Sequence, residues 1–100
     1  MVLGGATPST LDMDVREQFG RILRDLRKER KLSQEELAFR ANMNVTYLSD
    51  LERGIWNPSL AMLVDLSIAL EIHPADLLKG LLIDPSAPPS SRRRAVDSLE

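Results

Sequence analysis

The 100-residue sequence contains no cysteine and a single histidine, His73. Without cysteine there is no disulfide framework, no thiol nucleophile and no thiolate metal site. One histidine also disfavours a histidine-rich metal cluster or a catalytic pair built on histidine. No serine is accompanied by a pattern of residues that would activate it as a nucleophile. We therefore expect no catalytic residues, no metal and no cofactor, and predict that the protein is not an enzyme.

The sequence has no long apolar run and no leader-like N-terminus. Its opening, MVLGGATPST, lacks the basic and apolar regions of a signal peptide. No apolar stretch is long enough to cross a bilayer. We therefore expect a cytoplasmic protein with no membrane partner, folded as one compact domain that needs no disulfide or metal.

Positive and negative charges are nearly equal in number, with 13 basic and 15 acidic residues and a formal net charge of −2. The charge is unevenly distributed, because residues 14–31 contain seven basic and four acidic residues, a net charge of +3. The distribution of charge, more than its total, steers a charged ligand, so this segment is compatible with a polyanionic partner. An ordinary solvated helix of mixed charge explains the same composition equally well.

Strand-like alternation is absent, whereas helical patterns and helix signals are frequent. Apolar residues recur at the helical period over about residues 14–30. Ser33 and Glu36 form a capping-box pattern that predicts a second helix ending near Ala41, where Asn42 can adopt a left-handed turn. Asn44 is expected to cap a third helix that ends at Gly54.

Two prolines mark the starts of the remaining helices. Pro58 follows an expected Asn57 cap and predicts a fourth helix, and Pro74 predicts a fifth that includes ADLLKGLL. The fold class is therefore all-α, with a five-helix domain over residues 13–83. We expect disordered tails on both sides of it, a Gly/Thr/Ser/Pro-rich one at 1–12 and a Pro/Ser/Arg-rich one at 84–100.

The third helix has an outer face of short hydrogen-bonding groups. With Leu48 in the core, steps of 100° per residue place Leu51 and Ile55 beside it. The opposite side carries Thr46, Ser49, Asp50 and Arg53, with Val45 and Tyr47 on the shoulders. Thr, Ser and Asp are weaker helix formers than Glu or Lys, so solubility alone does not explain them. The second and third helices make a helix-turn-helix, whose second helix fits the DNA major groove.

The segment LSQEELAFRANMNVTYLSDLERGIWNPSL closely resembles the Cro/repressor-type (XRE-like) helix-turn-helix transcriptional regulators. FGRILRDLRKERKLSQEELA resembles the first two helices of that family, and LVDLSIALEIHPADLL the last two, so the resemblance covers about residues 14–82. NVTYLSDLERG is also similar to the controller proteins of restriction–modification systems. The resemblance implies a five-helix Cro/repressor-like domain that binds operator DNA, typically as a dimer.

By position in the family, the resemblance assigns roles to individual residues. The implied contacts to DNA bases come from Asn44, Val45, Thr46, Ser49 and Asp50. The implied contacts to DNA phosphates come from Gln34, Tyr47, Arg53 and Asn57. Arg27 and Glu52 match a structural ion pair that holds the third helix, although two independent surface charges are the alternative.

Three positions depart from the family's usual residues. Many relatives have glycine where Asn42 and Glu71 stand. Of these two residues, Glu is the less favourable in the left-handed conformation. Controller proteins often carry a long basic side chain where this sequence has Val45. Val45 can offer only an apolar contact, for instance to a thymine methyl group.

The end of the fifth predicted helix is rich in aliphatic residues, namely Leu77, Leu78, Leu81, Leu82 and Ile83. One edge of a small domain does not bury so many, so we predict a homodimer with these residues at its interface. Internal packing of all of them is the alternative. No ligand-sensing domain is attached, so we expect no small-molecule ligand.

Together these features predict a sequence-specific regulator, such as a repressor, that binds double-stranded DNA. It would act as a homodimer on a (pseudo)palindromic operator, with the third helix in the major groove. The alternative is a protein-interaction module, such as an antitoxin-type partner, that uses the same fold.

Overall fold

The computed structural model describes residues 13–86. These form α2 (Val15–Glu29), α3 (Gln34–Arg40), α4 (Val45–Glu52), α5 (Leu60–Leu70) and the short 3-10 helix η1 (Pro74–Leu77). No strand occurs in this part of the chain, which confirms its all-α class. The tail predicted at 1–12 and residues 87–100 of the second tail lie outside the described residues.

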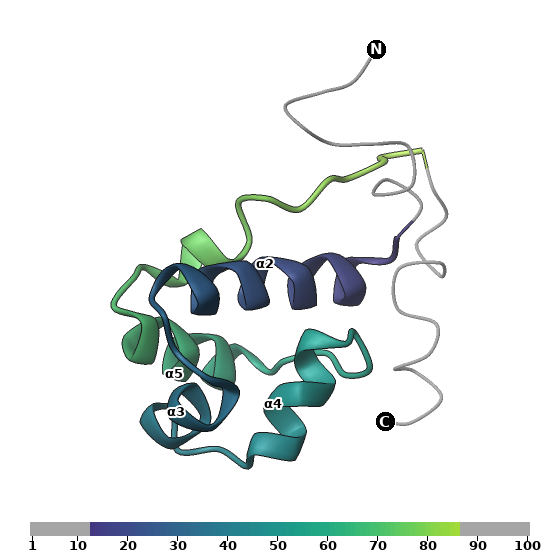
Figure 1. Cartoon of the computed structure of the whole chain (residues 1–100). Helices are drawn as coiled ribbons and strands as arrows, with labels where there is room; N and C mark the ends of the chain where they lie inside the picture. Colours follow the sequence, from purple (N-terminus) through teal and green to yellow (C-terminus); the bar gives the residue numbers. More distant parts are fainter. Residues whose placement is uncertain (1–12, 87–100) are drawn as a thin grey trace.

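The helices pack around one core of leucines. Figure 1 shows α2 across the middle of the molecule, with α3, α4 and α5 on one side and the segment after η1 on the other. Each helix supplies at least one fully buried leucine to this core: Leu23, Leu37, Leu48, Leu51, Leu66, Leu70 and Leu77. The core therefore fixes the positions of all the elements relative to α2.

The helix starts follow local capping rules. The predicted capping box at Ser33 is confirmed, and Asn44 caps α4 by accepting from the backbone N–H groups of Thr46 and Tyr47. The predicted start of the fourth helix is wrong by two residues. Ser59 is the cap, because its Oγ accepts from the Met62 N–H at 3.1 Å, and α5 begins after it.

All four α-helices end in the same way, with a residue in the left-handed region. These residues are Lys31, Asn42, Gly54 and Glu71, with φ between 55° and 80°. The N–H of the next residue then bonds back across the turn, as from Ile55 to the Asp50 carbonyl at 3.0 Å. This is a Schellman-type ending, which satisfies carbonyls left free at a helix end.

The predicted fifth helix is wrong in type, since Pro74–Leu77 form only a 3-10 turn capped by His73. After it the chain lies along α2, where the buried side chain of Gln18 holds the backbone of Leu82. Gln18 accepts from the Leu82 N–H at 2.7 Å and donates to its carbonyl at 3.2 Å. Gly80 also lies close to Ile22, since a Cβ there would be 3.2 Å from the Ile22 Cδ1. Between η1 and Leu82 the backbone bonds within local turns, as from the Leu81 N–H to the Leu78 carbonyl at 3.1 Å.

Candidate nucleic-acid interface

The inner edge of α4 is anchored in the core. Leu48 and Leu51 are completely buried, as their helical spacing predicts. Ile55, which the same spacing predicts to extend this edge, is instead 37% exposed. It lies beyond the end of α4, where the left-handed Gly54 turns the chain away from the helix axis. The buried edge therefore stops at Leu51.

A glycine lets α4 approach α2 closely. A Cβ on Gly20 would lie 2.6 Å from the carbonyl oxygen of Leu51 and would also collide with the carbonyl of Glu52. Any side chain at residue 20 would therefore push the end of α4 outward. Sequence reasoning did not single out Gly20, although a lone glycine inside a strong helical pattern is a signal of close packing.

A polar network joins α2, α3 and α4. Arg27 Nε donates to Glu52 Oε2 at 2.7 Å and Arg27 Nη2 to Glu52 Oε1 at 3.1 Å, which confirms the predicted ion pair. Both side chains are at most 10% exposed. The hydrogen bond to Glu52 raises the pKa of Arg27, outweighing the opposite effect of burial. Gln34 Nε2 donates to Glu52 Oε1 at 3.0 Å. The sequence suggested a phosphate contact for Gln34 but not this link.

The outer side of α4 presents short side chains from the predicted base-contacting set. Val45 and Thr46 are exposed, and Ser49 and Asp50 are half-buried. Arg53 Nη1 donates to Asp50 Oδ1 at 3.2 Å, so the carboxylate orients the guanidinium. The structure thus brings these residues onto one side of one helix, next to the cap of Asn44.

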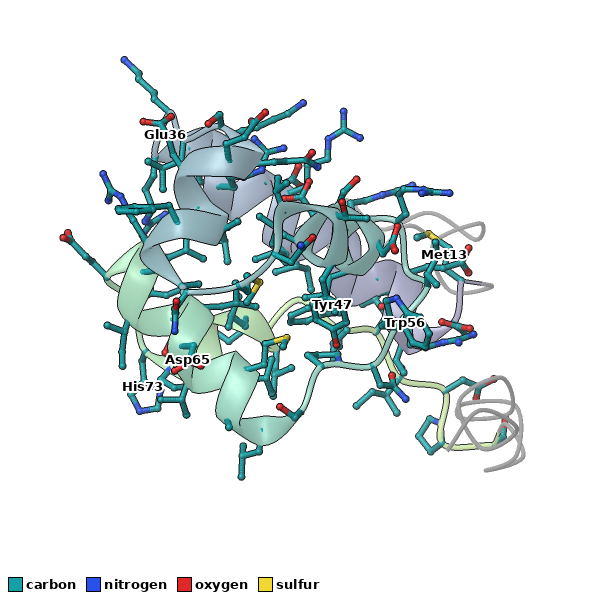
Figure 2. The ribbon with its side chains drawn as sticks, turned by 90° about the horizontal axis from the view of Figure 1, so that it is seen from below. Met13, Glu36, Tyr47, Trp56, Asp65 and His73 are labelled. Atoms are coloured by element: carbon teal, nitrogen blue, oxygen red, sulfur yellow. The ribbon has the colours of Figure 1, made fainter. Side chains whose placement is uncertain are left out.

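The residues predicted to contact phosphates lie on α4, at its end or beside it. Tyr47 stacks on Trp56, with ring centroids 6.4 Å apart and an interplanar angle of 24°, and Figure 2 shows the two side chains together. Both are partly buried against the core. Asn57 is half-buried in the loop that follows α4. The aromatic pair therefore supports the loop on which Asn57 lies.

The residues predicted for a dimer interface have different environments. Leu77 is fully buried in the core of its own chain, so its predicted place at a dimer interface is wrong. Leu81 packs against the same core and Leu82 is half-buried over α2. Leu78 and Ile83 remain exposed. Sequence reasoning missed a larger apolar surface on α5, where Leu60, Val64 and Ile68 are 77%, 39% and 69% exposed.

Metal binding and membrane crossing are two further possibilities for residues 13–86. No group of three or more His, Asp or Glu side chains there is arranged to hold a metal ion. None of the helices in this part of the chain is both long and apolar enough to span a bilayer.

Known proteins resemble this chain in sequence and in structure. A helix-turn-helix family model (HTH_3) matches residues 23–77. The control protein C.BamHI of Bacillus amyloliquefaciens is 42% identical over 66 residues, which cover 65% of this chain and 82% of that protein. Two other relatives are longer, and the chain spans 46% and 38% of their lengths.

Two solved structures have the same fold over most of their lengths. The restriction-modification controller protein C.AhdI from Aeromonas hydrophila aligns with a TM-score of 0.62 and 41% identity, covering 63% of this chain and 96% of that one. The biofilm regulator SinR, crystallised in complex with DNA, aligns with a TM-score of 0.59 and 35% identity, covering 61% and 98%. The family match includes α3, α4 and the turn between them. The chain belongs to the Cro/repressor-type (XRE-like) helix-turn-helix family, a family of regulatory DNA-binding proteins.

Proposed function

We propose that this protein is a transcriptional regulator that binds specific double-stranded DNA by placing α4 in the major groove. The observation that carries the proposal is the outer side of α4, where short hydrogen-bonding side chains project. Arg27 bonds the end of this helix to α2, and Gly20 lets the two helices approach closely. An α-helix fits the major groove, and short side chains reach base edges only when the helix lies close to them.

Each residue on this side of α4 has a role that suits its chemistry. The hydroxyl groups of Thr46 and Ser49 can donate to or accept from bases, and Val45 can contact a thymine methyl group. The Asp50 carboxylate accepts from a cytosine amino group or keeps Arg53 in place, as it does in the free protein. These contacts would determine which operator the protein selects.

The residues around α4 would bind the DNA backbone. The oxygen of Asn44 caps the helix, so its amide group is left to donate to a base or a phosphate. Tyr47, Arg53 and Asn57 carry further donors, and Gln34 retains one N–H beyond its bond to Glu52. Contacts of this kind set the register of the protein on the duplex and carry no base identity.

We further propose that the protein acts as a homodimer that pairs through α5. Leu60, Val64 and Ile68 are spaced four residues apart, so they form one apolar stripe along the exposed side of the helix. A second copy can cover this stripe with its own, because a two-fold interface joins identical patches. Exposed Leu78 follows η1, which packs against α5. Such a dimer would set the two α4 helices about 34 Å apart on a pseudopalindromic operator.

The protein-interaction alternative is less favoured. Protein–protein interfaces are enriched in aromatic residues, methionine and arginine and depleted in serine and aspartate. The outer side of α4 has small polar ones instead, and the apolar side of α5 suits a second copy of the chain.

The test is a binding selection on randomised duplexes with the parent protein and two variants. Thr46→Ala should change the base preferred at one or two positions, by roughly 1–3 kcal/mol. Asn57→Ala should weaken binding to all sequences about equally, because phosphates carry no base identity. Melting curves of both variants should match that of the parent.

Two outcomes would contradict the proposal. If the parent enriches no sequence, it is not a sequence-specific regulator. If Thr46→Ala keeps the full preference of the parent, α4 does not contact the bases, and the protein-interaction alternative becomes the better one.

A further inference from the structure

A cavity of about 220 Å³ opens between the first half of α2 and the end of α4. Its lining consists of Met13, Glu17, Arg21, Arg24, Glu52 and Arg53. Three of these six residues are arginines, Arg21 and Arg24 from α2 and Arg53 from the C-cap of α4. The cavity is therefore a basic site that neither helix forms by itself.

The residues that line this cavity carry a net positive charge, with three arginines against two glutamates. Glu52 is already neutralised by Arg27, with which it forms two hydrogen bonds. Glu17 is the other acid, and one of its oxygens accepts from the backbone N–H of Asp14. Within the described residues, the exposed side chains of Arg21 and Arg24 form no ion pair or hydrogen bond.

The third arginine connects this cavity with the outer side of α4. Arg53 is held by Asp50, but its side chain is 67% exposed, so this ion pair is weak and can exchange partners. A ligand bound at Arg21 and Arg24 would thus lie beside whatever α4 contacts. Planar guanidinium groups bind phosphate oxygens through paired N–H donors.

We infer that Arg21, Arg24 and Arg53 form a second contact with the duplex, a sequence-independent clamp on a phosphate group beside the groove that α4 enters. This inference rests on the proposed function and adds α2 to the DNA-binding surface. The clamp adds two cationic side chains to the DNA-binding surface of a chain whose net charge is −2.

The experiment measures affinity against salt concentration for the double variant Arg21→Ala with Arg24→Ala. The probes are the duplex recovered in the selection and a scrambled duplex of the same length. Binding to both should weaken by a similar factor, roughly tenfold at low salt for the loss of two solvent-exposed ion pairs with phosphate. The slope of log affinity against log salt should become shallower by about 1 for each phosphate that the protein no longer neutralises.

Three variants serve as controls. The double variant Arg21→Lys with Arg24→Lys keeps both charges and should retain most of the salt slope. Lys79→Ala removes one exposed charge just after η1 and should leave the slope unchanged. Glu17→Gln should strengthen binding, because it removes the one uncompensated acid while an amide oxygen can still accept from Asp14.

The outcomes separate this inference from the proposed function. If the parent binds neither duplex, both fail. If the parent binds and the Arg21 and Arg24 double alanine variant keeps its affinity and slope, the clamp is absent and the proposed function stands. A change in base preference in that variant would also overturn the inference, because a phosphate contact has no base identity.

Discussion

The helices α4 and α5 have similar inner sides and opposite outer sides. Each packs two completely buried leucines into the same core, Leu48 and Leu51 from α4 and Leu66 and Leu70 from α5. The outer side of α4 carries hydroxyl and carboxylate groups, whereas the outer side of α5 carries Leu60, Val64 and Ile68. The inner sides therefore explain the fold, and the outer sides indicate partners of different chemistry.

The two helices are also fixed in place by different contacts. The end of α4 is held by a buried carboxylate, Glu52, that accepts from Arg27 and Gln34. The end of α5 is held by Arg30, whose Nε donates to the Leu70 carbonyl at 2.6 Å. Loss of a partner leaves a buried charge in the first case and a neutral carbonyl in the second. We therefore expect the loss of its arginine partner to destabilise the protein more at α4 than at α5.

The largest expected effect follows from Arg27→Ala. It leaves the Glu52 carboxylate buried with only Gln34 as a side-chain donor, so stability should fall by about 3–5 kcal/mol. Arg30→Ala is the matched variant for α5 and should cost about 1–3 kcal/mol, since it removes a charged hydrogen bond from a carbonyl. Urea unfolding of both variants measures the difference. Equal losses would show that the network at Glu52 has no special role.

The outer sides can be compared by the same substitution on each helix. Ile68→Asp should weaken the proposed dimer, because each copy no longer buries one large aliphatic side chain. That burial contributes a free energy of about 1.5–3 kcal/mol per side chain. Thr46→Asp should abolish DNA binding by repelling phosphates and leave the dimer intact. Light scattering over a concentration series measures the dimer. A parent protein that stays monomeric at tens of micromolar would contradict the proposed use of α5.

The helix ends provide a smaller contrast. Gly54 after α4 and Glu71 after α5 both have positive φ, of 80° and 60°. Glu71→Gly should raise stability by about 0.5–1 kcal/mol, because glycine adopts this conformation without the cost that a side chain imposes. Gly54→Ala should lower it, since a Cβ there would lie 2.8 Å from the Glu17 Cα. Thermal melting measures both the expected gain and the expected loss of stability. A loss of stability in Glu71→Gly would show that the Glu71 side chain is itself stabilising.

The smallest expected effect is a change in the stability of the fold at acidic pH. The caps of α4 and α5, Asn44 and Ser59, do not titrate, whereas the cap of α2 is Asp14. Burial raises the pKa of Asp14, but hydrogen bonds from Arg16 and from backbone N–H groups outweigh it and hold the pKa below its usual value. Ionised Asp14 therefore stabilises the fold above the unfolded-state pKa of about 3.9, and this contribution is lost as pH falls through the lower folded-state pKa.

Asp14→Asn tests this difference between caps. Asparagine caps a helix about as well as aspartate, so the variant should remain folded at neutral pH. Its stability should decline less than that of the parent below about pH 4, as measured by melting curves over a pH series. Parallel declines would show that other carboxylates dominate the acid response.

The sequence by itself determined the features that depend on neighbouring residues. The capping box at Ser33, the Asn44 cap and the left-handed turns at Asn42 and Gly54 all follow from it, because side chains a few residues apart satisfy the free groups at helix ends. The ion pair of Arg27 with Glu52 follows from the family resemblance of the sequence.

Only the tertiary structure decided the features that depend on residues far apart in the chain. Gln18 holds the backbone of Leu82, 64 residues away, and Pro74–Leu77 form one 3-10 turn in place of the predicted fifth helix. The link from Gln34 to Glu52 and the basic cavity also join separate helices. The apolar stripe of α5 is exposed because the core is already filled by the other side of that helix. Helical periodicity shows which residues share a side, but packing decides which side faces the core and which is left for a partner.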